Sequence, residues 1–215
     1  MRLPLPQFSG SPRHPTHIAE VIETSTTEFL AQCLSSEELK LATMPDFGSF
    51  VKAKDEETGN QILGVVYAAT TAPIDSVHRA RALGLSIEEL REEQPQIFAM
   101  LKTEFKSIIV GNADPLGRYL QYLPPRPPQI HQSVYECPPE EVVAFSEQFD
   151  FLRPLLEVAG APSDALTAAA MRTIYKMRQF DRDWLIAAGR NLSLILREDY
   201  DRLRYILSQC RVSGG

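Results

Sequence analysis

The chain has 215 residues, of which 44% are apolar and 23% are charged, a composition typical of a globular protein with a buried core. Its net charge of −6 is divided unevenly: residues 151–215 carry 10 Lys and Arg against 7 Asp and Glu, whereas residues 1–150 carry a net charge of −9. This acidic first part argues against a strong phosphate-binding surface there, because Lys and Arg supply most of the affinity for nucleic acid.

No secretion signal, membrane span or disulfide framework is predicted. The first residues are Pro-rich without a continuous apolar run, and no stretch approaches 18 apolar residues without a charge. Cys33, Cys137 and Cys210 are odd in number, widely spaced and contain no CxxC pair. This pattern fits a reducing compartment, so we expect a cytoplasmic protein.

In chain order, residues 1–15 contain four prolines with Ser and Gly, and we predict a flexible leader. Short strands are then predicted around Ile18 and Phe29, followed by a short helix at residues 36–41 and a strand at Phe50–Lys54. The polar segment 55–60 contains Gly and is predicted to form a hairpin turn.

The next strand, residues 61–71, contains the run Ile62-Leu63-Gly64-Val65-Val66. Such a run is too apolar for a strand with one solvated face, so we predict burial on both sides. Gly64 inside it indicates a bulge or a tight bend.

A helix is predicted to begin after Ser86, because Ser86 and Glu89 have the spacing of a capping box, and to run to about Glu93. Strands follow around Ile108 and at residues 118–123. A stiff Pro-rich segment then leads to a last extended stretch at residues 131–135, and a short helix is predicted from Pro138 through Phe145.

The composition changes near Phe149, after which no β-like run remains and Ala becomes frequent. We predict a helix at about residues 163–179 and a second one, capped by Asp181, running to about Gln209 or breaking near residues 189–191. On the second helix we expect Trp184 to be buried against barrel residues or against Phe180 or Ala188, which are four residues away on either side.

No catalytic constellation is visible, and we expect no cofactor and no metal. The nearest approach to a phosphate-binding loop is residues 111–118, which have the wrong spacing, Arg118 in place of Lys and Asp114 where phosphate would lie, so a β-turn is predicted. The four histidines are isolated, and Glu136 beside Cys137 would raise the thiol pKa rather than activate it.

Basic and aromatic residues alternate in the C-terminal region, and the candidate interaction residues are Arg172, Tyr175, Lys176, Arg178 and Arg182. Basic side chains interleaved with aromatics can bind single-stranded nucleic acid. We favour an amphipathic helix with a buried aromatic face, because acidic residues dilute the basic character. A third interpretation is docking or self-association through the apolar face.

The segments His17–Phe29, Gly48–Lys54, Gln61–Tyr67 and Pro124–Pro128 together resemble the HAS barrel, the small β-barrel at the N-terminus of HerA-type DNA translocases and of ATP synthase catalytic subunits. The resemblance covers residues 16–135. In those proteins a P-loop ATPase follows the barrel, whereas here a helical region follows it. The chain is similar to stand-alone cyanobacterial HAS-barrel proteins.

We therefore predict an α+β fold in which an antiparallel β-barrel with a helical insertion, at residues 16–148, precedes a helical region at residues 149–215. Because HAS barrels join side by side in the ATPases, the resemblance implies a non-enzymatic protein–protein interaction or assembly module that binds a protein partner or itself. The alternative is an accessory protein of a nucleic-acid-processing complex, working with a translocase or nuclease. A small-molecule enzyme is the least favoured interpretation.

Overall fold

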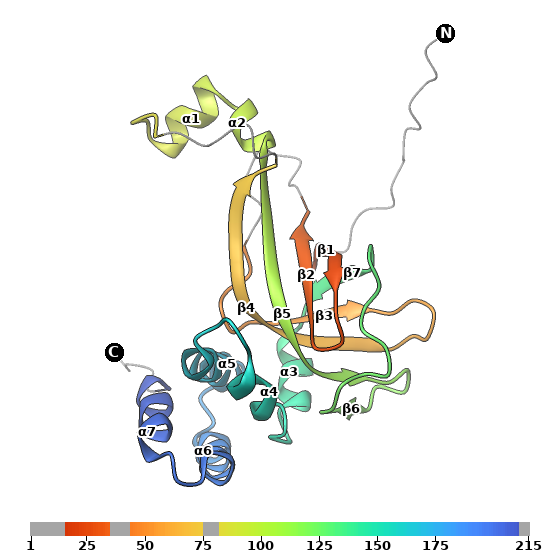
Figure 1. Ribbon diagram of the computed structural model, residues 1–215, viewed down its shortest axis with the longest axis vertical. Coiled ribbons are helices and arrows are strands. Elements are labelled where there is room, and N and C mark those ends of the chain that lie inside the picture. Colours follow the sequence, from red (N-terminus) through yellow and green to blue (C-terminus); the bar gives the residue numbers. More distant parts are fainter. Residues whose placement is uncertain (1–15, 35–43, 75–81, 211–215) are drawn as a thin grey trace.

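A barrel of antiparallel strands and a set of helices on one side of it make up the molecule, as the computed structural model in Figure 1 shows. The structure describes residues 16–34, 44–74 and 82–210. The predicted leader and the helix predicted at residues 36–41 lie outside these described residues. The predicted α+β class, with barrel first and helices after it, is confirmed.

Six strands close the barrel, in the order β2-β1-β7-β3-β4-β5, and the pairing of β2 with β5 completes the ring. Every neighbouring pair is antiparallel. The strands are β1 (His17–Thr24), β2 (Glu28–Cys33), β3 (Phe50–Lys54), β4 (Gln61–Pro73), β5 (Leu101–Ala113) and β7 (Ser133–Glu136).

The strand predicted at residues 118–123 is shorter than expected and lies outside the closed ring. It forms β6 (Tyr119–Leu120), which pairs with the end of β5. The prolines that follow have no N–H to donate and cannot prolong a ladder. They lie beside the hairpin between β3 and β4, where the guanidinium of Arg126 is 3.5 Å from the carboxylate of Glu57. The chain then returns as β7, which fills the place between β1 and β3.

The predicted hairpin turn at residues 55–60 is confirmed. The N–H of Asp55 donates to the carbonyl of Asn60 at 2.8 Å, and Gly59 has a φ of +75°, a conformation that Gly adopts without strain. The carboxylate of Asp55 also accepts a hydrogen bond from the Thr58 hydroxyl at 2.6 Å. These local bonds fix the turn that sets the register of β3 against β4.

Burial of β4 on both faces, predicted from its apolar run, is confirmed. Ile62 and Val66 belong to the cluster inside the barrel, whereas Leu63 and Val65 belong to the cluster on its outer face, under the helices. The register shifts between Leu63 and Gly64, so the predicted bulge is present. A Cβ at Gly64 would lie 2.3 Å from the Ser107 hydroxyl, which is why only Gly fits here.

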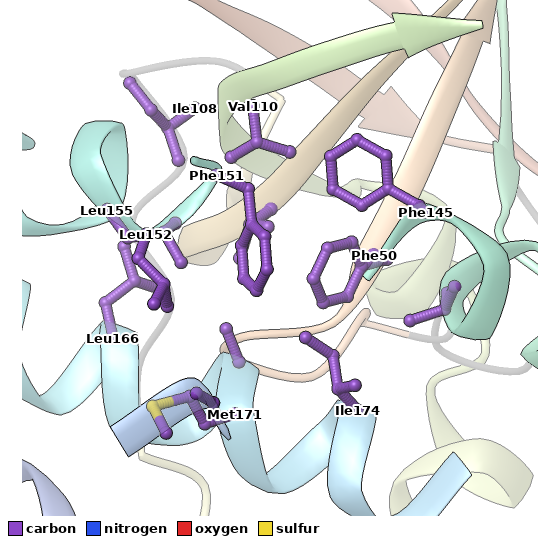
Figure 2. Close-up of a cluster of buried hydrophobic side chains, with 14 of the residues drawn as sticks. Phe50, Ile108, Val110, Phe145, Phe151, Leu152, Leu155, Leu166, Met171 and Ile174 are labelled. Carbon is purple, nitrogen blue, oxygen red and sulfur yellow. The ribbon is translucent and has the colours of Figure 1, made fainter. Parts of the chain in front are cut away.

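The helices after β7 share one apolar cluster with the outer face of the barrel, and the last two of them pack mainly on the other helices. The helices are α3 (Pro139–Phe145), α4 (Leu152–Glu157), α5 (Ser163–Met177), α6 (Arg182–Leu196) and α7 (Tyr200–Gln209). Figure 2 shows the contact, in which Phe50 of β3 lies among Phe145, Phe151 and the α5 side chains Met171 and Ile174. Barrel and helices therefore share one hydrophobic cluster.

The last predicted helix breaks, but not at residues 189–191. Gly189 lies inside α6, where a Cβ would be 3.4 Å from the Leu207 side chain. The break comes instead at Arg197, whose φ is +46°, and Asp199 then caps α7 by accepting from the N–H of Arg202. Gly189 is therefore an interior residue of α6, within van der Waals reach of α7, and does not end the helix.

None of the helices among the described residues is long and apolar enough to cross a membrane.

Candidate functional site

Two of the five predicted interaction residues hold the helices together. Arg172 donates to the carbonyl of Gln209 at 2.8 Å and so links α5 to α7. Arg178 donates to the carbonyl of Val143 at 2.6 Å and to the carboxylate of Glu147 at 2.7 Å. Its guanidinium also lies over the Trp184 ring, 5.4 Å from the centroid. Both arginines are thus used in contacts within the chain.

The other three lie nearer to solvent. Lys176 and Arg182 are exposed, and Tyr175 is half-buried with its ring against Phe180. Lys176 shares a face of α5 with Arg172, four residues earlier, whereas Arg178 is directed toward α3. The five residues therefore do not converge on one surface.

The segment from Gly111 to Gly117 contains the end of β5 and then, from Asp114, the turn that leads to β6, so the predicted β-turn is confirmed. The Asp114 carboxylate accepts from the N–H groups of Leu116 and Arg118 and pairs with the Arg118 side chain at 2.7 Å. The hydrogen bond from the Arg118 backbone is the main cause that lowers the pKa of Asp114. The chain continues into a strand, so no helix N-terminus faces this turn.

The three cysteines are free and buried. Burial raises the pKa of Cys33 and of Cys210 to about 11, and it raises the pKa of Cys137 further. A protonated thiol is a poor nucleophile and a poor metal ligand. Within the described ranges, no three His, Cys, Asp or Glu side chains lie close enough together to hold a metal ion.

A cleft of about 780 Å³ lies between the outer face of the barrel and α4. Ile108 and Val110 of β5 contribute to the apolar lining of the cleft. Tyr67 and Glu28 also line it, and the Tyr67 hydroxyl donates a hydrogen bond to the Glu28 carboxylate. Burial, together with this carboxylate, raises the pKa of Tyr67, so the phenol stays protonated at neutral pH. This hydrogen bond therefore has a structural role rather than a role in general acid–base catalysis.

The most prominent surface feature is an arm, which we define as residues 71–74 and 82–103. β4 and β5 are 13 residues each, and beyond the pairing of β2 with Glu104 their far ends extend past the barrel as a two-stranded ribbon (Figure 1). Two short helices lie at its tip, α1 (Ile87–Glu93) and α2 (Gln96–Ala99).

The capping box predicted for α1 is confirmed. The N–H of Glu89 donates to the Ser86 hydroxyl at 3.2 Å, and the N–H of Ser86 donates to the Glu89 carboxylate at 2.7 Å. Local capping thus holds α1, because neither α1 nor α2 contains a buried residue.

The arm exposes large apolar side chains. Ile74 is 61% exposed and Ile87 55%, and Leu83 and Met100 are also exposed. An apolar surface on a projecting element is typical of a contact site. The sequence predicted the helix of this insertion but not the arm, because residues 68–73 give only a weak indication of where the barrel ends. The one available signal is that this stretch is apolar or neutral without being bulky.

Comparison with known proteins agrees with the barrel. Residues 18–121 match the family model described as the HAS barrel domain. This range begins in β1, includes the arm and ends just after β6, before the strand that closes the ring. No curated protein matches the chain.

Proposed function

Because residues 18–121 match the HAS barrel domain, we propose that the protein is a non-enzymatic interaction or assembly module, whose arm contacts another protein chain. The observation that carries the proposal is the exposed apolar surface of the arm, formed by Ile74, Leu83, Ile87 and Met100. A cytoplasmic location belongs to the proposal, since three free cysteines fit a reducing compartment.

The physical argument is the weak internal packing of the arm. A two-stranded ribbon is marginally stable by itself, and short helices gain most of their stability from tertiary packing. Here α1 and α2 have no buried residue, so the arm contributes little apolar burial to the isolated chain. Contact with a partner would cover this surface, and the four glutamates of α1 would favour a partner with basic residues at the rim.

Shortening the arm tests the proposal. Ala72 of β4 lies opposite Lys102 of β5 at a hydrogen-bonded position of the ladder, so residues 73–101 can be replaced by Asn-Gly, which favours a tight hairpin turn. We expect the shortened variant to keep the circular dichroism of the barrel and to lose the partners that wild type yields in cross-linking mass spectrometry from the source cells. Equal recovery of the same partners by both forms would contradict the proposal.

The second candidate is an accessory protein of a nucleic-acid-processing complex. Exposed Lys176 and Arg182, with Phe180 50% exposed near them, favour this alternative. Its weakness is that Arg172 and Arg178 are engaged within the chain. Fluorescence anisotropy with single- and double-stranded oligonucleotides distinguishes the two. Salt-sensitive binding that is lost in Lys176→Ala/Arg182→Ala would favour the nucleic-acid role.

A further inference from the structure

The outer edge of β4 is an unpaired strand edge. β3 pairs with β4 from Gln61 to Val65. At Val66 the carbonyl accepts a hydrogen bond from the N–H of Gly48, and the N–H donates to the carbonyl of Ser49. From residue 68 to Pro73, β4 pairs with β5 alone in the part of the chain that the structure describes. A free edge presents N–H and C=O groups to which another strand can bind.

The groups that face outward follow from the ladder with β5. The N–H of Ile74 donates to the carbonyl of Met100 at 2.8 Å, so the backbone groups of Ile74 point toward β5. The N–H and C=O of one residue point to the same side, and successive residues alternate. Ala69 and Thr71 therefore direct their N–H and C=O groups away from β5, toward solvent.

From Ala68 to Ala72 this edge has neither the charges nor the proline that commonly protect an edge strand, and Pro73, which cannot donate, lies just beyond this stretch. Residues 67–74 read Tyr-Ala-Ala-Thr-Thr-Ala-Pro-Ile and contain no charged side chain. On β5, in contrast, Lys102 and Glu104 form an ion pair at 2.6 Å. Edge strands are commonly protected by charges of this kind. The two strands of the arm thus differ, and β4 is the one open to pairing.

Exposed apolar side chains lie at both ends of the edge. Ile74 is at the tip, and Met44 and Phe47, both exposed, belong to the segment that reaches β4 at Gly48. If a second β4 pairs antiparallel, its tip lies at the base of the first. Ile74 of each copy then meets the Met44 and Phe47 segment of the other.

We propose that two copies of this chain pair through the outer edges of β4, antiparallel about a two-fold axis at Thr70. The proposal rests on the arm being a protein contact surface. In this register Ala69 of the first copy and Thr71 of the second exchange two N–H···O=C bonds. The two-fold axis generates an equivalent pair of bonds between Thr71 of the first copy and Ala69 of the second. Thr70 faces Thr70 of the second copy in a pair without backbone hydrogen bonds.

A second copy is the occupant that suits this edge best, because the edge is self-complementary. Ala68 faces Ala72, Ala69 faces Thr71 and Thr70 faces itself, so small neutral side chains meet throughout. A two-fold contact also covers the outer β4 edge of both copies, so no such edge remains free to bind a third copy.

Register-specific cross-linking tests the pairing. Cα atoms of a pair without hydrogen bonds are about 4.5 Å apart, within the span of a disulfide, whereas diagonal Thr71 residues are about 7–8 Å apart. Under mild oxidation we expect Thr70→Cys to yield at least about tenfold more covalent dimer than Thr71→Cys, because only the first geometry fits. The three natural cysteines are buried and provide a low background. Equal yields, or none, would overturn the proposal.

Solution mass provides the second readout. Sedimentation should give wild type twice the 24.1 kDa of the chain. Thr70→Lys places two like charges on the axis and should raise the dimer dissociation constant at least about tenfold, whereas Thr70→Val should not. Gln96→Lys, an exposed position on α2, is the control for added charge. A monomeric wild type, or equal effects of both lysines, would reject the pairing.

The two proposals can fail separately. If wild type is monomeric but loses its partners when the arm is shortened, the edge pairing is wrong and the interaction function stands. If wild type is dimeric through Thr70 but partner recovery does not depend on the arm, the pairing stands, and the arm is a self-association element alone.

Discussion

At the scale of single residues, local contacts decide which side chains are structural. Trp184 is 6% exposed, its indole N–H donates to the carbonyl of Ser146 at 2.8 Å, and its ring lies 6.0 Å from that of Phe149. Its predicted burial is confirmed, and its ring neighbour is Phe149. Phe180 lies before α6 with a φ of +64° and packs against Tyr175.

Replacement of Trp184 should therefore destabilise the protein strongly. We expect Trp184→Ala to cost about 3–5 kcal/mol in the free energy of unfolding, because it removes a buried aromatic ring. Phe180→Ala, at an exposed position, should change it by no more than about 0.5 kcal/mol. Urea denaturation compares the two variants, and similar losses would contradict this assignment of the buried ring.

The hairpin between β3 and β4 gives a prediction about pH. The Thr58 hydroxyl, and to a smaller extent the N–H groups of Glu57 and Thr58, lower the pKa of Asp55 in the folded state, against the opposing effect of burial. A carboxyl group with a lowered folded pKa stabilises the fold above its unfolded pKa of about 3.9, and this stabilisation is lost as the pH falls through the folded value.

Carbon NMR titration should therefore give Asp55 a midpoint below about 3.9, and Thr58→Val should move the midpoint upward. Asp55→Asn should make the unfolding free energy less dependent on pH in the acid range. A midpoint at or above the ordinary value would mean that the Thr58 hydrogen bond does not stabilise the charged form.

At the scale of elements, sequence patterns predicted what depends on neighbours along the chain. The double-sided burial of β4, the hairpin turn and the caps at Ser86 and Asp181 all follow from local spacing, and the structure confirms them. Three features depended on distant packing and were not predicted. These are the helix α4, the break between α6 and α7 at Arg197, and the arm that projects beyond the barrel.

The candidate site shows the same division. The pattern of Arg172 to Arg182 is visible in the sequence, but the partners of Arg172 and Arg178 are carbonyls on α7 and α3, 37 and 35 residues away. No local pattern reveals such a contact. The free edge of β4 likewise depends on how far β3 extends along β4, and this is known only from the strand pairing.

At the scale of the whole molecule, the segment nearest to a phosphate-binding loop in sequence is part of a β-hairpin. We expect the protein neither to bind ATP tightly nor to hydrolyse it, because the only Gly-to-Gly approach to a phosphate loop, Gly111 to Gly117, is a hairpin turn with Asp114 at its centre. Calorimetry with Mg-ATP checks this. Micromolar binding that Arg118→Ala abolishes would contradict it.

The position of β7 has a consequence for how the barrel comes together. β7 pairs with both β1 and β3, yet it follows them by roughly a hundred residues. During synthesis the barrel therefore cannot close until residues 133–136 have left the ribosome, and until then the edges of β1 and β3 remain unpaired. Such non-local closure slows folding. For the same reason a fragment ending at residue 121, where the family match ends, would lack the strand that completes the barrel.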